Sequence, residues 1–496
     1  MHHLSFIESR QKLLFNLFIP ATFFVFALCF MPIGQVFQFD PSDEGIELIK
    51  AVLHSEGFAL YTQIWNDQPP FSTIILSFWL GLFGKSIFAA RLLTLSFSTI
   101  LVWSFCQNLR IYLGNFAAII GTLLLVISCN FLRLSVSVMI GLPALAFAML
   151  AIYFLTLYKQ RGSYFLLVFS GSLLALSLQI KLFTAFIVPL IIFELIKNNL
   201  TNYHLQKSKY RLFYEIAVWL GSFLTVFIVV GLLFNSLNYE ELLKSHFASK
   251  VKTAFNQQNS LGLVWSFFVL DFDYFLLSIV ATIKIIKSKQ WEQSFPLIWL
   301  IVSIMLLFNH RPVWYHHYLL VSIPLTWLAT YGVTLSFPFF QKRHWYLNFK
   351  QNRFRQLTLS EFAVVFLMIS ILAIPLKLEI TQLENHRLME KSRENLQLLN
   401  VVLEHKKYTH WFFTDCPMYA FYSGLPVPPE IAVLSNIRIE SRSITREQIL
   451  SVMKTYHPEQ ALLCKSKVIQ GYLNSYLSEH YLKTYESHSG THYLIK

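Results

Sequence analysis

Long apolar runs recur along most of the chain, and short polar segments separate them. A helix needs about 20 apolar residues to cross about 30 Å of hydrocarbon. Runs of this kind are expected to form membrane spans at about 14–37, 92–105, 113–131, 136–157, 163–180, 182–197, 212–234, 262–283, 295–309, 314–337 and 361–376, with a shorter apolar helix over 70–83. The pattern predicts an all-α polytopic membrane protein with about 11 to 13 transmembrane helices.

From about residue 378 the pattern changes to short apolar runs between polar stretches. Ile449 and Met453 lie four positions apart in an amphipathic stretch over 445–456, as expected for one face of a helix. This predicts two domains, a transmembrane domain over 1–377 and a small α/β domain over 378–496. Its cysteines, Cys416 and Cys464, could pair in an oxidising compartment or remain buried thiols.

Composition and charge support a membrane protein. The 496 residues are 55% hydrophobic and only 14% charged, too apolar for one soluble core. Two polar segments, 197–211 and 342–355, carry basic residues and no acid, which predicts that they are cytoplasmic. The loop after the first span and the C-terminal domain then lie outside. The net charge of +13 reflects topology and anionic lipid headgroups rather than nucleic acid.

The loop over residues 38–70, here called the acidic loop, concentrates carboxylates beside the membrane. It carries one lysine, Lys50, and six acids: Asp40, Asp43, Glu44, Glu47, Glu56 and Asp67. Apolar residues between Gly45 and Ser55 recur every three or four positions, which predicts an amphipathic helix on the membrane surface. Glu47 and Glu56 are interpreted as solvated charges on this helix.

Two interpretations of the acids at the start of that helix are open. In one, Ser42 caps the helix while Asp43 and Glu44 complement its dipole. In the other, Asp43 directly after the first span and Asp67 before Pro69-Pro70 are anchored at neighbouring helix ends and face one cleft.

Several segments carry a resemblance to a known family. A DE pair opens a helix in the first loop and a PP pair begins the second span. Three further segments have family counterparts: GLFGKSIFAARLLT (81–94), HRPVWYHHYLLVSIP (310–324) and TDCPMYAFYSGLPVPPE (414–430). Their order resembles the GT-C fold membrane glycosyltransferases, in particular the protein O-mannosyltransferase and aminoarabinose transferase group (glycosyltransferase families 39 and 83).

The resemblance implies transfer of a sugar from a polyprenyl-phosphate donor to a hydroxyl of a glycan, lipid or protein, on the extracytoplasmic side of a membrane, taken to be the bacterial inner membrane. Asp43 is then the expected general base, with Glu44 assisting it. Asp67 is expected to bind sugar hydroxyls, the acceptor or, with Asp43, a divalent cation such as Mg²⁺ or Mn²⁺. Gln68 stands where the aminoarabinose enzymes have a lysine, which makes aminoarabinose a doubtful substrate.

Positive charge is needed for the departing phosphate. The candidate cations are Arg311, Lys181 and either Lys85 or Arg91, although Lys181 could instead be an interfacial lysine that reaches the headgroups. His316, His317 and Tyr318 could donate hydrogen bonds to the same phosphate. They could instead form an interfacial aromatic belt, which is the favoured interpretation for His316.

Three further polar residues have two interpretations each. His246 is a candidate contact for the donor headgroup, although its loop is also interpreted as an ordinary solvated basic segment. Asp271 and Asp273 fall inside the predicted 262–283 span, where a carboxylate is expected to face the bundle interior. They could also mark a kink or a re-entrant break that exposes them to water.

Two other classes of function compete with the transferase. A transporter or flippase for polyprenyl-linked sugars explains the many spans and the intramembrane acids. It gives no role to the acidic loop or to the C-terminal domain. A non-enzymatic assembly subunit would tolerate any change at Asp43.

Overall fold

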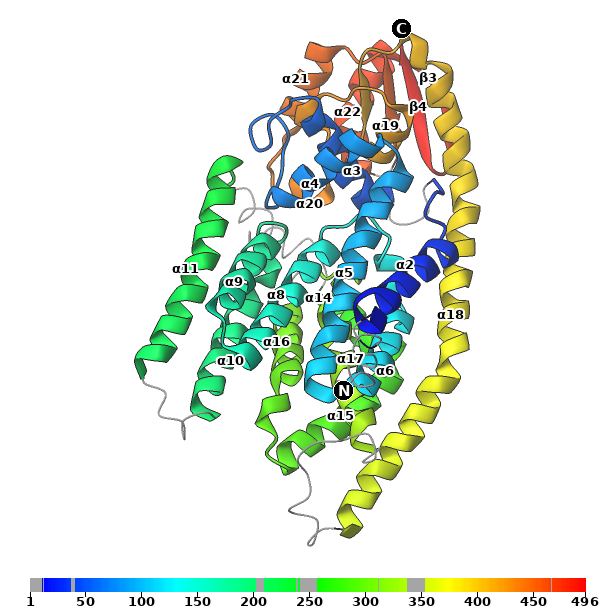
Figure 1. Ribbon diagram of the computed structural model, residues 1–496. Coiled ribbons are helices and arrows are strands. Elements are labelled where there is room, and N and C mark those ends of the chain that lie inside the picture. The colour runs from blue at the N-terminus through cyan, green and yellow to red at the C-terminus, as the bar shows by residue number, and fades with distance from the viewer. Residues whose placement is uncertain are drawn as a thin grey trace.

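The structure is a computed structural model and describes residues 11, 13–36, 41–201, 209–237, 240, 257–310, 312–336, 353–464 and 466–496. It is mostly helical, with one small sheet near the C-terminus (Figure 1). This confirms the predicted fold class.

The predicted apolar runs form helices close to their expected positions. These are η1 (Leu14–Phe18) with α2 (Ile19–Phe30), α4 (Phe71–Phe83), α5 (Ile87–Leu113), α6 (Asn115–Ile127), α8 (Gly141–Arg161), α9 (Tyr164–Leu178), η2 (Leu182–Phe186) with α10 (Ile187–Thr201), α11 (Lys209–Leu233), α14 (Gln257–Leu270), α15 (Phe272–Lys287), α16 (Phe295–Asn309), α17 (Tyr318–Ser336) and α18 (Arg353–Glu404). Among the described residues, five helices are long and apolar enough to cross a membrane, and a bent pair adds a sixth. Five shorter apolar helices accompany them. The count of 11 to 13 spans stays a prediction.

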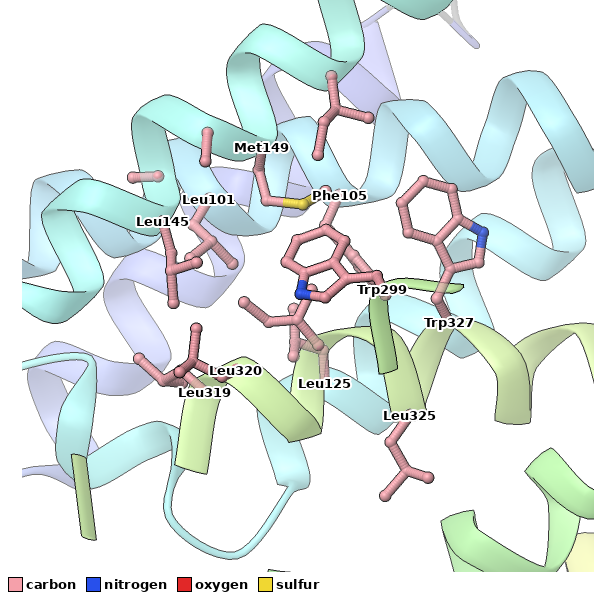
Figure 2. Packing of buried hydrophobic residues seen from close by; sticks show 14 of the residues in the cluster. Leu101, Phe105, Leu125, Leu145, Met149, Trp299, Leu319, Leu320, Leu325 and Trp327 are labelled. Carbon is pink, nitrogen blue, oxygen red and sulfur yellow. The ribbon is translucent and has the colours of Figure 1, made fainter. Parts of the chain in front are cut away.

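Large apolar side chains fill the centre of the bundle. Trp327 of α17 meets Phe105 of α5 edge to face, with ring centroids 5.9 Å apart, and Trp299 of α16 meets Phe295 in the same way at 6.0 Å. Figure 2 shows Trp299 and Trp327 among leucines from α5, α6, α8 and α17. Helices distant in sequence therefore share one core, which holds the ends of these helices in fixed positions.

The predicted 262–283 span is broken. Helices α14 and α15 meet at Asp271 with a bend of 81°. Asp271 and Asp273 are fully buried, and Lys377 of α18 donates to one oxygen of each at 2.8 Å. The kink is confirmed. The predicted exposure to water is wrong, because Lys377 compensates the two charges inside the protein.

Helix α18 runs along one side of the bundle and continues past residue 377 to the sheet, where it ends at Glu404 (Figure 1). The sheet has the order β1-β2-β4-β3, in which β1 (Phe412–Thr414) and β2 (Gln460–Leu463) are parallel and the other pairs antiparallel. Its remaining strands are β3 (Tyr481–Ser487) and β4 (Gly490–Ile495). The helices of this region are α19 (Pro417–Ser423), α20 (Asn436–Glu440), α21 (Arg446–Tyr456) and α22 (Lys467–His480), which confirms the helix expected over 445–456.

The acidic loop folds against the C-terminal domain. Its helix α3 (Pro41–Ser55) is the predicted amphipathic helix, and it begins at Pro41, so Ser42 lies inside the helix rather than at its cap. The buried apolar residues of α3, among them Leu48, Ile49 and Leu53, belong to a cluster shared with the C-terminal domain. The apolar face is therefore covered by protein, and the prediction that it lies on the membrane surface is wrong in this respect.

Candidate active site

The DE pair at the start of α3 divides into two environments. Glu44 is fully buried and forms a two-pronged pair with Arg91 of α5, with N–O distances of 3.1 and 2.7 Å. The backbone N–H of Val138 also donates to Glu44, at 2.9 Å. Asp43, one residue earlier, keeps 44% of its side-chain surface exposed. Adjacent positions on a helix point in different directions, so one acid anchors the helix and the other is accessible.

The pair of Glu44 and Arg91 fixes the first turn of α3. The third nitrogen of the Arg91 guanidinium donates to the backbone oxygen of Ile33 at 3.0 Å, which ties the end of the preceding segment to the same point. Removal of one partner of such a buried pair typically costs about 3–5 kcal/mol, because the other charge is left uncompensated. Two predicted site residues, Glu44 and Arg91, are thus in direct contact with each other.

The second acid, Asp67, lies in a segment held by main-chain contacts. The backbone oxygen of Gln68 accepts from the Tyr61 hydroxyl and from the Asn66 amide, both at 2.8 Å. Pro69 and Pro70 follow, and α4 begins at Phe71, as the PP pair predicts. The backbone N–H of Phe71 donates to Gln179 at 3.0 Å. This bond joins the end of the acidic loop to the segment that carries Lys181.

Lys181 lies at the break between α9 and η2, with an extended backbone. Burial lowers the pKa of its ammonium to about 8, and the charges of Asp43, Glu47 and Asp67 oppose this decrease. The charges of these three residues of the acidic loop all act on Lys181, so the break between α9 and η2 faces the acidic loop. The ammonium therefore remains mostly charged at neutral pH while being held close to a carboxylate.

His316 lies between Lys181 and Asp43. The Lys181 ammonium is 3.5 Å from Nε2 of His316, and Nδ1 of the same ring is 3.8 Å from a carboxylate oxygen of Asp43. Burial lowers the pKa of His316 well below its usual value, and the charges of Lys181 and His310 add to this effect. The ring is therefore neutral at pH 7. If Nε2 accepts from the Lys181 ammonium, the neutral ring carries its proton on Nδ1, toward Asp43.

The neighbouring residues have different environments. His317 is buried, and its Nδ1 accepts from the backbone N–H of Trp314 at 3.1 Å. Tyr318 is also buried, and its hydroxyl donates to Asp271 in the broken span. The sequence favoured His317 and Tyr318 as donors to the phosphate, whereas the structure places His316 beside Asp43. His246 and Arg311 lie outside the described residues.

Glu47 differs from its predicted solvated state. Its side chain is only 12% exposed and accepts from Lys50 at 2.9 Å. It borders a narrow cleft that is otherwise lined mainly by apolar side chains of α4, α5 and α8, including Leu76, Phe97 and Pro143. Glu56 is exposed and pairs with Lys85 at 2.7 Å, as expected for a surface charge.

Among the described residues, one group of three side chains is arranged so that it could hold a metal ion. This group is Asp415, Cys416 and Cys464, whose ligand atoms lie within 4.8 Å of one another. Cys416 follows β1 and Cys464 follows β2, and these two strands are neighbours in the sheet. Asp43 and Asp67 form no group of three with another described histidine, cysteine or acid.

Comparisons with known proteins found a family model that matches part of the chain and solved structures that share its fold. A family model described as dolichyl-phosphate-mannose-protein mannosyltransferase matches residues 67–234. A search of curated proteins found no match. The matched region begins at the second acid of the site and includes Arg91 and Lys181.

Solved structures match nearly the whole chain. ArnT from Cupriavidus metallidurans bound to undecaprenyl phosphate has a TM-score of 0.60 at 13% identity, over 97% of both chains. The Archaeoglobus fulgidus oligosaccharyltransferase in the apo form has a TM-score of 0.57 at 11% identity, over 91% of this chain and 70% of that one. AglB from the same organism, with an inhibitory peptide and a dolichol-phosphate, has 0.54 at 11%, over 90% and 69%. The fold is the one that the sequence resemblance predicted.

Proposed function

We propose that this multi-pass membrane glycosyltransferase of the GT-C fold moves a sugar from a polyprenyl-phosphate donor to an acceptor hydroxyl, with Asp43 as the general base. The observation that carries the assignment is the alignment of Asp43, His316 and Lys181, an accessible carboxylate next to a neutral imidazole and a buried ammonium. The matched structures with undecaprenyl phosphate and dolichol-phosphate support the donor class.

The reaction requires one base and one positive charge. Asp43 accepts the proton of the acceptor hydroxyl, and the acceptor oxygen forms a bond to the anomeric carbon of the sugar. The bond from that carbon to the phosphate oxygen breaks, and polyprenyl phosphate leaves with the electron pair. Lys181 stabilises the charge on the departing phosphate, and a positioned base typically contributes about 10²–10⁴-fold.

His316 and Asp67 have supporting roles in this proposal. The Nδ1–H of His316 orients the Asp43 carboxylate once substrate draws the two together, because the present separation of 3.8 Å is too long for a hydrogen bond. Asp67 binds sugar or acceptor hydroxyls. Asp43 and Asp67 remain the acids that would hold a divalent cation, since Mg²⁺ needs only one or two carboxylates and keeps several waters. No step depends on that ion.

The placement of the reaction also belongs to the proposal. The basic segments 197–211 and 342–355 favour a cytoplasmic position for these loops, with the active site and the C-terminal domain on the extracytoplasmic face of a bacterial inner membrane. A donor presented on that face reaches Asp43 without crossing the helical core.

The test is sugar transfer in proteoliposomes that contain a polyprenyl-phosphate sugar and an acceptor, with wild type compared to Asp43→Asn. We expect the variant to lose transfer by about 100-fold or more, because the amide cannot accept the proton. Transfer by the variant at the wild-type rate would overturn the assigned base. Movement of the donor across the bilayer by wild type without transfer would instead support a flippase.

A further inference from the structure

The acidic loop and the C-terminal domain share one hydrophobic core, separate from the core of the membrane helices. The cluster joins residues of α3, of the segment that follows it and of α4 and α5 to residues of α18, α19 and the sheet. Its buried members include Leu48, Ile49, Leu53, Leu60, Ile64, Leu76, Leu80, Leu398, Val402, Phe412, Met418, Tyr419, Phe421 and Leu462. The loop that carries Asp43 is thus packed against residues from Leu398 onward.

Next to this core, the backbone of Gly45 in α3 lies close to the start of α19. A Cβ atom at Gly45 would lie 2.7 Å from the backbone nitrogen of Met418 and 3.2 Å from Cγ of Pro417. The first distance is to backbone, so an alanine here could be accommodated only if one of the two helices moved. Glycine is needed at this position because two backbones meet.

The other side of the same helical turn is fixed by the buried pair of Glu44 and Arg91. Asp43 is therefore one residue from an anchor in the membrane domain and two residues from a contact with the C-terminal domain. A second contact joins the loop to that domain near Asp67, where the Arg438 guanidinium lies 5.1 Å from the centre of the Trp65 ring.

We infer that α19 of the C-terminal domain positions the catalytic base, with Gly45 and the Pro417-Met418 backbone as the positioning contact. This inference rests on the proposed function, in which Asp43 takes the acceptor proton. The contact presses the first turn of α3 toward Arg91, and Asp43 is held at its distance from His316 and Lys181. The C-terminal domain is in this way part of the active site without touching substrate.

A small displacement has a large expected effect. Misplacement of a catalytic group by about 1 Å can lower the rate about 100-fold, even when the change lies away from the chemistry. Gly45→Ala would separate α3 from α19 and move Asp43 relative to Lys181. Donor binding through Lys181 is expected to change little, so kcat falls while KM for the donor stays within about twofold.

The pH profile distinguishes positioning from a general loss of folded protein. The neutral ring of His316 lies 3.8 Å from Asp43, and the charges of Asp43, Glu47 and Asp67 all act on the Lys181 ammonium. Moving the Asp43 carboxylate away from the ammonium shifts the acidic limb of the rate profile to higher pH. A lower fraction of folded enzyme reduces the amplitude and leaves that limb unchanged.

The experiment compares transfer by full-length wild type, Gly45→Ala and Gly81→Ala in proteoliposomes over a range of pH. Gly81 is an exposed helical glycine with no atom within 4 Å of an added Cβ, so Gly81→Ala is the matched control and should behave as wild type. For Gly45→Ala we expect kcat to fall about tenfold or more with the acidic limb displaced upward. A wild-type kcat, or a reduced amplitude with an unchanged limb and a lower thermal midpoint, would overturn the inference.

Transfer by Asp43→Asn is measured in the same assay, so that an error in the assigned base can be distinguished from an error in the positioning contact. If Asp43→Asn transfers sugar at the wild-type rate, the proposed base is wrong whatever Gly45→Ala does. If Asp43→Asn is inactive and Gly45→Ala matches Gly81→Ala, the base stands and the positioning contact is wrong.

Discussion

Two clusters in this molecule combine carboxylates with a lysine and have opposite surroundings. In the broken span, Lys377 contacts Asp271 and Asp273 at 2.8 Å each, and all three side chains are at most 5% exposed. At the acidic loop, His316 lies between Lys181 and Asp43, at 3.5 and 3.8 Å, and the Asp43 side chain is 44% exposed. In the first cluster, called the closed cluster, the charged groups contact one another directly. In the second, called the open cluster, the His316 ring separates the Lys181 ammonium from the Asp43 carboxylate.

We interpret the charges of the closed cluster as structural and those of the open cluster as part of the proposed reaction. Charges in the closed cluster compensate one another, and they bind α18 to the bend between α14 and α15. A base must be able to reach a proton on substrate, and a phosphate-binding ammonium must have donors to spare. Only the open cluster meets these needs, although an acid inside a span is the more conspicuous feature of the sequence.

The largest effect on stability is expected from Lys377→Met. The change leaves Asp271 and Asp273 buried without a counter-ion, which typically costs about 3–5 kcal/mol. We expect little folded protein and a strongly lowered thermal midpoint in detergent. The control is the triple variant Lys377→Met with Asp271→Asn and Asp273→Asn, which removes all three charges and should recover most of the midpoint. No recovery would contradict the view that the uncompensated charges cause the loss.

In the open cluster, Lys181→Met should affect activity rather than stability. We expect kcat/KM for the polyprenyl-phosphate donor to fall about 10- to 100-fold, since the departing phosphate loses its cation. The thermal midpoint should stay close to that of wild type. Lys85→Met is the matched control because its ammonium pairs with Glu56 on the surface. Equal losses in the two variants would mean that a general surface charge, not the site, attracts the donor.

A smaller effect is expected on the pH dependence. The pKa of Lys181 is lowered to about 8 by burial, so its charge is present below that pH and is lost above it. Transfer by wild type should therefore decline as the pH rises through about 8. Lys181→Arg keeps its charge at high pH, and the decline should move to higher pH in this variant even if its maximal rate is lower. An alkaline limb at the same pH in both enzymes would assign it to another group.

The helices were predictable from the sequence, and the partners of the site residues were not. Run length placed the spans, and two acids within one run indicated the break at Asp271. Sequence spacing could not show that Glu44 pairs with Arg91, 47 positions later, because such a contact depends on how helices pack. Nor could it separate His316 from His317. The two are adjacent, and only the short η5 turn (Tyr315–His317) determines which ring faces Asp43.

The C-terminal domain illustrates the same limit. Its mixed α/β character and the helix over 445–456 followed from the apolar pattern, whereas its contact with the acidic loop did not. An amphipathic helix at a membrane surface and one covered by another domain have the same periodicity. Gly45 offered a local indication, since a glycine near the start of a helix can mark close packing, yet the sequence does not say against which segment.

The most direct test of the account measures transfer rate and thermal midpoint on the same preparations of Asp43→Asn and Asp273→Asn. The account predicts that Asp43→Asn loses transfer by about 100-fold or more and keeps the wild-type midpoint. Asp273→Asn should keep the transfer rate of its folded fraction and change the midpoint. Normal transfer by Asp43→Asn, together with inactive but fully folded Asp273→Asn, would contradict the central claim and assign the chemistry to the closed cluster.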